Sequence, residues 1–305
     1  FSIETKLLAH DGVEDDQFGF SVAIDGDYAI VGALKDHNNN LSDNGAAYIY
    51  NVHTGAEIHK LTASDGGASD QFGVSVDIDG NYAIVGVRYD DDKGSNSGSA
   101  YIFNVQTGTE VHKLLAIDGG ESDYFGRSVA ISGNYAIVGA YGNSDAGNES
   151  GSAYIFNVQT GTQLYKLTAS DGVADDEFGQ SVAISGNYAI VGAWKDDDKG
   201  GASGSAYIFN VQTGAQVYKL TADDGSQSDQ FGKSVAISDN YAIVGAWVDD
   251  PKDTSSGSAY IFGPSSPSLL SIDNDSGNMN VNGHMNVSGG NLGIGTMSPI
   301  TLLNI

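Results

Sequence analysis

The sequence predicts an all-β fold, a β-propeller built from five similar blades. First, the pair Phe-Gly recurs five times with spacings of 53 or 54 residues, at Phe18, Phe72, Phe125, Phe178 and Phe231. Second, each copy holds four apolar runs of strand length separated by Gly, Asn and Asp, the pattern of short antiparallel strands. Third, no stretch of useful length has helical periodicity. Four strands in a repeat of this length are typical of propeller blades.

The copy that begins at Phe178 illustrates the four strands of each unit. SVAIS (181–185) alternates and is followed by a Gly-Asn turn and YAIVGA (188–193), a combination typical of a tight hairpin. After an acidic, Gly/Ser-rich loop come SAYIFNV (205–211), the turn QTG, and QVYKLTA (216–222). An Asp-Gly loop then leads to the next Phe-Gly pair. Each unit therefore predicts one antiparallel, four-stranded blade.

The two ends of the repeat region predict a closed ring. The chain begins inside a fourth strand, Ile3 to Ala9, and its Lys6-Leu7 matches Lys219-Leu220. The last copy stops after its third strand, SAYIF (258–262). We therefore expect the N-terminal strand to pair with the strand around Tyr260 and complete the fifth blade, because closure removes exposed sheet edges. The predicted propeller covers residues 1–263.

The composition limits the classes of partner. The 305 residues include 39 acidic and 13 basic residues, a formal net charge of −26, and no Cys. Nucleic acids and anionic membrane surfaces both attract basic proteins, so neither is an expected partner. No apolar run approaches the roughly 20 residues of a membrane span. The charge instead favours divalent cations and neutral partners.

The segment after the repeats differs in composition and predicts a separate stem. Residues 264–276 are interpreted as a linker, and residues 277–305 as a Gly/Asn-rich β-stem or oligomerisation segment. MNVNG (279–283) and MNVSG (285–289) repeat with a period of six. Such short strands cannot form a core alone, so we expect several chains to share one, giving a homo-oligomer, either a trimer or a filament.

Two stretches of the sequence resemble known families. FGQSVAISGNYAIVGA (178–193) and SGSAYIF (203–209) resemble FG-GAP repeats, the blade repeat of integrin α-subunit heads, in their bacterial and viral form. LGIGTMSPITLLNI (292–305) resembles a segment common in phage tail fibres and related bacterial surface fibres. These resemblances imply a propeller in an extracellular protein, on a cell surface or a virion.

Calcium is the one cofactor that the sequence suggests. The integrin-type repeat often carries a DxDxDG calcium loop between its first two strands, but here that connection, such as Asp25-Gly26-Asp27, is too short. Carboxylates that could hold Ca²⁺ recur elsewhere, ahead of each Phe-Gly pair and in two acidic loops. They are Asp11, Asp16, Asp65, Asp70, Asp118, Asp123, Asp171, Asp176, Asp224 and Asp229 in the first set, and Asp90, Asp92, Asp196 and Asp198 in the second.

Three other interpretations of these acids stay open. The paired aspartates could form Asx turns that cap the loops, and the loop clusters could simply be solvated. They could also pair with a lysine that recurs on the fourth strand, which would lower the need for a cation. That lysine is Lys6, Lys60, Lys113, Lys166 and Lys219 in successive copies.

A candidate binding rim lies at the position that follows the second strand. Arg88, Tyr141, Trp194 and Trp247 occupy it in four consecutive copies, and both Trp residues of the chain fall there. A propeller places equivalent positions side by side on one face. Aromatic rings beside Asp and Asn are suited to sugars, since a ring stacks on the pyranose and the acids accept hydroxyl hydrogens. The alternative is that each ring covers only the edge of its own blade.

These patterns favour binding over catalysis. The sequence has no nucleophile elbow, no HExxH and no phosphate loop. The leading hypothesis is a non-enzymatic adhesion or receptor-binding head of a fibre that recognises a surface glycan or protein. The alternatives are a structural subunit of an extracellular filament and a secreted polysaccharide hydrolase.

Overall fold

The computed structural model describes residues 4–37, 41–250, 255–264, 270–272 and 279–281. The chain divides into two compact units, Phe1–Phe262 and Gly263–Ile305. In the second unit, β20 (Leu270–Ile272), inside the predicted linker, pairs antiparallel with β21 (Met279–Val281). The rest of the predicted stem, residues 277, 278 and 282–305, lies outside the described residues.

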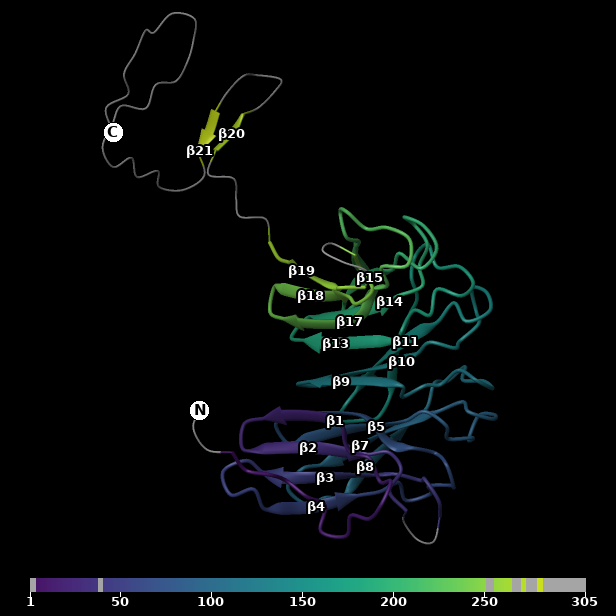
Figure 1. Ribbon diagram of the computed structural model, residues 1–305, viewed down its shortest axis with the longest axis vertical. Coiled ribbons are helices and arrows are strands. Elements are labelled where there is room, and N and C mark those ends of the chain that lie inside the picture. The colour runs from purple at the N-terminus through teal and green to yellow at the C-terminus, as the bar shows by residue number, and fades with distance from the viewer. Residues whose placement is uncertain (1–3, 38–40, 251–254, 265–269, 273–278, 282–305) are drawn as a thin grey trace, which may run out of the picture. The chain divides into compact units, whose positions relative to one another are not determined.

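The first unit consists of five antiparallel sheets that follow one another in chain order (Figure 1). Blade 1 contains β1 (Phe18–Asp25), β2 (Tyr28–Ala33), β3 (Ala46–Asn51) and β4 (Glu57–Leu61). Blade 2 contains β5 (Phe72–Asp79), β6 (Tyr82–Val87), β7 (Ser99–Asn104) and β8 (Glu110–Leu114). Blade 3 contains β9 (Ser128–Ser132), β10 (Tyr135–Ala140), β11 (Ser152–Asn157) and β12 (Gln163–Leu167).

Blade 4 contains β13 (Ser181–Ser185), β14 (Tyr188–Ala193), β15 (Ser205–Asn210) and β16 (Gln216–Leu220). Blade 5 has three strands, β17 (Phe231–Ser238), β18 (Tyr241–Ala246) and β19 (Ser258–Phe262). The prediction of an all-β protein with five propeller blades, one for each repeat, is confirmed.

The third blade shows why these residues form strands. Val138 of β10 lies opposite Val129 of β9 and Tyr154 of β11, so every strand pairs with its neighbour in the chain. Gly133 takes a φ of +55° in the turn that joins β9 to β10, as a tight hairpin requires. Nearly all of YAIVGA is buried because a neighbouring blade covers each face of the sheet.

The repeated phenylalanine fills the space between blades. The ring of Phe125 packs at a tilt against Tyr154 and edge-on against Phe156, with centroid distances of 5.5 and 5.8 Å. The same apolar cluster contains Ile84 and Leu114 of the preceding blade. Each Phe therefore joins its own sheet to the sheet before it through burial of apolar surface.

Glycine permits close contact between the backbones of adjacent blades. A Cβ built on Gly139 would lie 2.0 Å from the carbonyl oxygen of Gly179 in the next blade. The same oxygen accepts a 2.8 Å hydrogen bond from the Ser128 hydroxyl. Gly32, Gly86 and Gly192 make the equivalent approach to the following blade. This contact sets the spacing of the sheets.

Asp77 adds one polar contact between blades 2 and 3. The other blades carry alanine at this position, as in Ala130. The Asp77 carboxylate accepts hydrogen bonds from the N–H groups of Ile78, at 2.9 Å, and Ile131, at 2.8 Å. Burial, with a smaller contribution from the nearby Asp79 and other acids, raises the pKa of Asp77 from 3.8 to about 6.

We expect Asp77→Ala to change the pH dependence of stability. A carboxyl whose pKa is higher in the folded than in the unfolded chain lowers the free energy of unfolding as pH rises between the two values, here from about 4 to about 6. The free energy of unfolding of the variant, relative to that of the wild type, should therefore rise by about 1–2 kcal/mol when the pH is raised from about 4.5 to about 8. This range allows for the partial exposure of Asp77. Urea unfolding at both pH values measures this difference, and a difference that is independent of pH would contradict it.

The prediction that the N-terminal strand closes the ring is wrong. Residues 4–9 form no strand, and within the described residues β19 pairs only with β18. Leu7 and Ala9 instead pack on the apolar cluster of blade 1, where the Tyr50 hydroxyl donates to the Leu8 carbonyl at 3.0 Å. Leu7 and Ala9 thus pack against blade 1 in the same way as Leu61, at the end of β4, packs against blade 2.

The physical reason for the open arrangement is that blades 1 and 5 do not face each other. Ile24 of β1 is 70% exposed and Ile261 of β19 is 74% exposed, whereas the equivalent residues of inner blades are covered by a neighbour. The N-terminal segment that packs on blade 1 is therefore out of reach of β19.

The part of the chain described here includes no apolar helix of the length needed to cross a bilayer.

Candidate functional site

The four predicted rim residues directly follow the second strand of blades 2 to 5, and each has a partner just before the Phe-Gly pair of its own blade. Arg88, Trp194 and Trp247 each hydrogen-bond the residue 17 positions earlier. Tyr141 stacks on the equivalent residue, Tyr124. The four side chains therefore occupy equivalent places on successive blades.

Aromatic contacts connect blade 2 to blade 3 along this rim. The Arg88 guanidinium donates to the Gln71 side-chain carbonyl at 2.9 Å and lies 4.5 Å above the centre of the Tyr89 ring. Tyr89 contacts Tyr124 edge-on, and Tyr124 stacks on Tyr141 with centroids 5.0 Å apart and planes at 10°. One face of the Tyr141 ring is therefore already covered by a neighbour.

Trp194 on blade 4 is held between charged groups. Its indole N–H donates to the buried Glu177 carboxylate at 2.6 Å, and Lys195 forms an ion pair with the same carboxylate. The ammonium of Lys233, on blade 5, lies 3.6 Å from the centre of the indole ring, a cation–π distance. Trp194 is thus a fixed part of a polar cluster, with little freedom to move.

Trp247 on blade 5 is the most open aromatic side chain of the rim. It is 61% exposed, and its indole N–H donates to the Gln230 side-chain carbonyl. That bond fixes one edge of the indole and, among the described residues, its faces stay accessible. Among the four rim residues, Trp247 therefore offers the largest apolar surface to a ligand.

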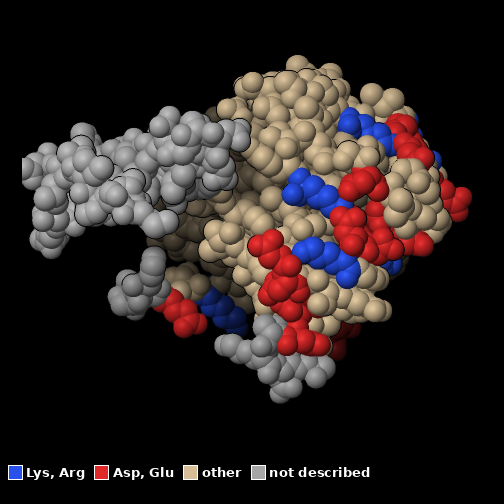
Figure 2. All heavy atoms as spheres, turned by 90° about the horizontal axis from the view of Figure 1, so that it is seen from above, with Lys and Arg blue, Asp and Glu red and all other residues tan. Residues whose placement is uncertain are grey.

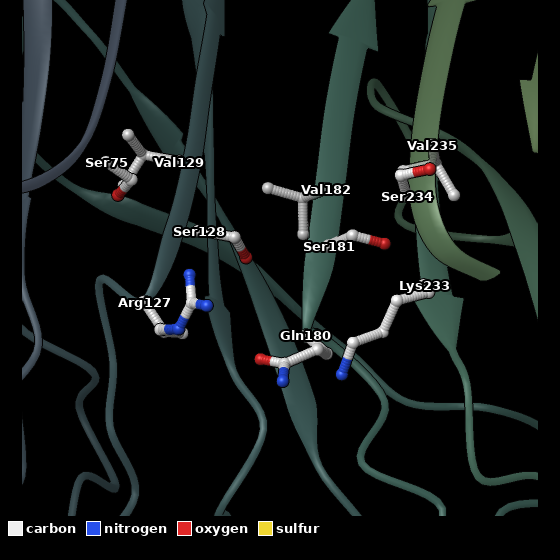
Figure 3. Close-up of a pocket in the computed structure, with 10 residues that line it drawn as sticks. All are labelled: Ser75, Arg127, Ser128, Val129, Gln180, Ser181, Val182, Lys233, Ser234 and Val235. Carbon is white, nitrogen blue, oxygen red and sulfur yellow. The ribbon is translucent and has the colours of Figure 1, made fainter. Parts of the chain in front are cut away.

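An open pocket of about 290 Å³ lies beside the rim, between the first strands of blades 2 to 5. Arg127, Gln180 and Lys233 line it, and each directly follows the Phe-Gly pair of its own blade. Figure 3 shows the polar ends of these three side chains gathered at one end of the pocket. Serines and valines from the same strands form the rest of the lining, among them Ser75, Ser128, Ser181, Ser234, Val129, Val182 and Val235.

Within the described residues, no carboxylate lies at ion-pair distance from the two cations of this pocket, Arg127 and Lys233, or from Arg88 on the rim beside it. Burial, and then the charge of Arg88, lower the pKa of Arg127. Burial also lowers the pKa of Lys233; the charge of Glu177 opposes this effect, while Arg127 and Lys195 add to it. Positive charges are therefore concentrated here without direct ion pairs among the described residues, in a chain whose net charge is −26.

Sequence reasoning missed this pocket, although a signal for it was present. The residue after Phe-Gly changes in every copy while its neighbours repeat, being Phe20, Val74, Arg127, Gln180 and Lys233. The residue before Phe-Gly changes as well, being Gln17, Gln71, Tyr124, Glu177 and Gln230. Variation at a fixed point of an otherwise repeated unit marks positions that the blade itself does not require.

Most of the candidate calcium ligands surround lysine. In blade 2, the Lys113 ammonium contacts Asp65 at 2.7 Å, Asp90 at 3.0 Å and Asp92 at 2.7 Å. Burial alone would lower the pKa of Lys113, but the hydrogen bonds that its ammonium donates to these carboxylates raise it. Equivalent clusters are Lys60 with Asp11 and Asp36, Lys166 with Asp118 and Asp145, and Lys219 with Asp171, Asp196 and Asp198. Figure 2 shows blue cationic side chains set between red acidic ones on the face in view.

The second aspartate of each pair caps its own loop. Asp176 accepts the Val173 N–H at 2.8 Å, and the same bond to the residue three positions earlier recurs in all five copies, at Asp16, Asp70, Asp123, Asp176 and Asp229. Burial, with repulsion from Asp196 and Asp197, raises the pKa of Asp176 to about 6. These acids therefore cap their loops, as one of the open interpretations expected, although the bond runs back along the chain and not forward as in an Asx turn.

The acidic side chains do not form a calcium cage in the described part of the chain. No group of three or more His, Asp or Glu residues there is arranged to hold a metal ion. The ammonium groups of Lys60, Lys113, Lys166 and Lys219 occupy the centres where a cation would lie. In blade 5, Asp224 and Asp249 accept from the Tyr260 hydroxyl at 3.0 and 2.9 Å, and no lysine among the described residues is paired to them.

Fold and site together define a repeat-built β-propeller whose variable side chains gather on one rim. A family model described as the FG-GAP repeat matches residues 1–50, 56–103, 109–156, 162–209 and 215–262. The chain therefore belongs to the FG-GAP repeat family, whose propellers are typically non-enzymatic. A comparison with curated proteins found no match.

Proposed function

We propose that this protein is a non-enzymatic binding head of an extracellular fibre or cell-surface adhesin that recognises a surface glycan through its propeller rim. The observation that carries the proposal is the placement of Arg88, Tyr141, Trp194 and Trp247 at equivalent points of four successive blades, beside an open pocket. FG-GAP repeat proteins are commonly extracellular or surface-exposed, which supports the location.

Recognition of sugars follows from the chemistry of this rim. An exposed indole such as Trp247 can stack on the apolar face of a pyranose, while neighbouring amides and hydroxyls bond to its hydroxyl groups. Each rim side chain is held by its contact with the residue 17 positions earlier, so binding would cost little conformational entropy. Rigid aromatic residues on a fixed scaffold are well suited to a solvated, polar ligand.

Trp247→Ala should weaken glycan binding at least tenfold, because it removes the most accessible stacking surface of the rim. A glycan array would first identify a bound sugar, and titration calorimetry with that sugar would then compare the variant with the wild type. Tyr218→Ala is the matched control, since Tyr218 is 60% exposed but lies on β16, the outermost strand of its blade. Equal binding by all three proteins would remove the rim from the proposed function.

A structural subunit of an extracellular filament is the second candidate function. It is favoured by the apolar faces that blades 1 and 5 leave open, at Val22 and Ile24 on one side and at Ile243 and Ile261 on the other. Both faces are covered at every inner blade interface. A second copy placed head to tail would bury them in the same way.

Electron microscopy and light scattering of the purified chain distinguish the two candidates. A filament subunit should form polymers whose length grows with concentration, and Ile24→Asp should reduce them strongly, because it places a charge in the buried contact. Val173→Asp, a change at an exposed loop residue, is the control. Particles of a single, concentration-independent mass would exclude the filament.

A further inference from the structure

We propose that the pocket formed by Arg127, Gln180 and Lys233 binds a sugar that carries an anionic group, either a carboxylate or a sulfate. This inference rests on the proposed function, and it adds the chemical class of the ligand and the residues that select it. Three features of the pocket support it: the positions of its cations, an unpaired amide oxygen, and its size.

The first feature is the presence of cations where the blade does not need them. Blades 1 and 2 carry Phe20 and Val74 at the position that follows Phe-Gly, so apolar residues satisfy the repeat. Blades 3 and 5 carry Arg127 and Lys233, and the described residues give neither of them a carboxylate partner. By contrast, the repeated lysines such as Lys113 are all but surrounded by acids. A cation that has no ion-pair partner at a half-buried position costs free energy, which an anionic ligand would recover.

The guanidinium of Arg127 determines the kind of anion. Guanidinium presents two parallel N–H donors that match the two oxygens of a carboxylate or a sulfate. Lys233 lies across the pocket on the other side of Gln180 (Figure 3) and adds a second donor. Arg88 adds positive potential at the pocket, since its charge helps to lower the pKa of Arg127. The pocket can therefore hold one oxyanion group between two cations.

The second feature is the Gln180 side-chain oxygen. This atom is buried and has no hydrogen-bond partner among the described residues. A buried acceptor without a donor costs about 1–3 kcal/mol, and a sugar hydroxyl is a donor of suitable size. Gln180 thus favours a ligand that has hydroxyl groups beside its anionic group, which distinguishes an acidic sugar from a simple inorganic anion.

The third feature is the size and surroundings of the pocket. A volume of about 290 Å³ is at the lower end for ligand pockets, so it suits a single sugar unit better than a long segment. The Trp194 ring is close by, since Lys233 lies over it. A polysaccharide could therefore place one acidic residue in the pocket and continue along the aromatic rim.

The test uses three oligosaccharide probes of matched length: oligogalacturonate, which carries carboxylates, sulfated dextran and neutral dextran. Titration calorimetry of the purified chain should give at least tenfold tighter binding to one of the acidic probes than to neutral dextran. Arg127→Gln should reduce that affinity at least tenfold and leave the weak binding of neutral dextran unchanged. This variant is compatible with folding because blade 4 carries Gln180 at the same position. Lys93→Gln, at an exposed loop lysine, makes the same change of net charge away from the pocket and should have no effect.

The possible results separate this inference from the function on which it rests. Equal binding of acidic and neutral probes, or a preference for acidic probes that survives both Arg127→Gln and Lys233→Gln, would overturn the inference. If Trp247→Ala still abolished binding in that case, the glycan-binding rim would stand without an acidic specificity. Failure to bind any glycan on an array would contradict the proposed function itself.

Discussion

Gly139→Ala should destabilise the propeller by about 3 kcal/mol or more, whereas Gly245→Ala should change its stability by less than about 0.5 kcal/mol. The two glycines occupy the same position, in blades 3 and 5. At Gly139 a new Cβ would lie 2.0 Å from the Gly179 carbonyl oxygen, which is backbone and cannot rotate away. At Gly245 the nearest atom is the Ser234 hydroxyl oxygen at 2.4 Å, a flexible group, and no following blade is present.

Urea unfolding of the two variants, followed by circular dichroism, measures this difference. Each glycine has a serine hydroxyl 2.4 Å from the new Cβ, Ser128 in one case and Ser234 in the other. The comparison therefore isolates the contact with the next blade. Equal losses of stability in the two variants would show that the clash lies within the blade, and would contradict the account of blade spacing given above.

Lys113→Met should destabilise the protein by about 3 kcal/mol. Asp90 is only 4% exposed, and without the lysine it would keep hydrogen bonds from the Asp92 N–H and the Ser99 hydroxyl, both at 3.0 Å, and from the Tyr101 hydroxyl, at 3.3 Å, but no positive charge. Removing one member of a buried ion pair costs about 3–5 kcal/mol, and the three remaining donors reduce that cost. Methionine keeps most of the aliphatic volume, so the change is mainly one of charge.

Thermal and urea unfolding with and without calcium test both the size and the cause of this effect. Lys93→Met, at an exposed lysine, is the control and should be nearly neutral. The wild type should melt at the same temperature in calcium and in chelator, because the ammonium already occupies the acidic cluster. A lower melting temperature in chelator would show that calcium is bound elsewhere in the chain.

The blades were predictable because each uses local signals that five copies repeat. Strand alternation, the Gly-Asn turns and the Phe-Gly pair are all contained in about 50 residues, and each predicted its structural role correctly. The pairing of the repeated lysine with aspartates was also anticipated, since both residues recur together. Closure of the ring was not predictable, because it depends on how the small angles between blades add up. No local pattern encodes that sum.

The candidate site was only partly predictable for a different reason. The rim residues Trp194 and Trp247 were found because they are unusual in this sequence. Their partners Glu177 and Gln230, and the pocket residue Arg127, are ordinary surface residues when read alone. Only the fold shows that the residues on both sides of Phe-Gly reach the same rim. Comparing the copies position by position, with attention to what varies, would have identified them.

The division between repeated and unrepeated positions has a consequence for how such a protein can diversify. Phenylalanine, glycine and the lysine–aspartate clusters hold the sheets together, while side chains such as Arg127 and Trp247 contribute little to that assembly. Point substitutions at the latter positions can therefore alter the ligand without a large loss of stability. A lineage under pressure to follow a changing host surface could retarget its receptor through these few codons and leave the scaffold untouched.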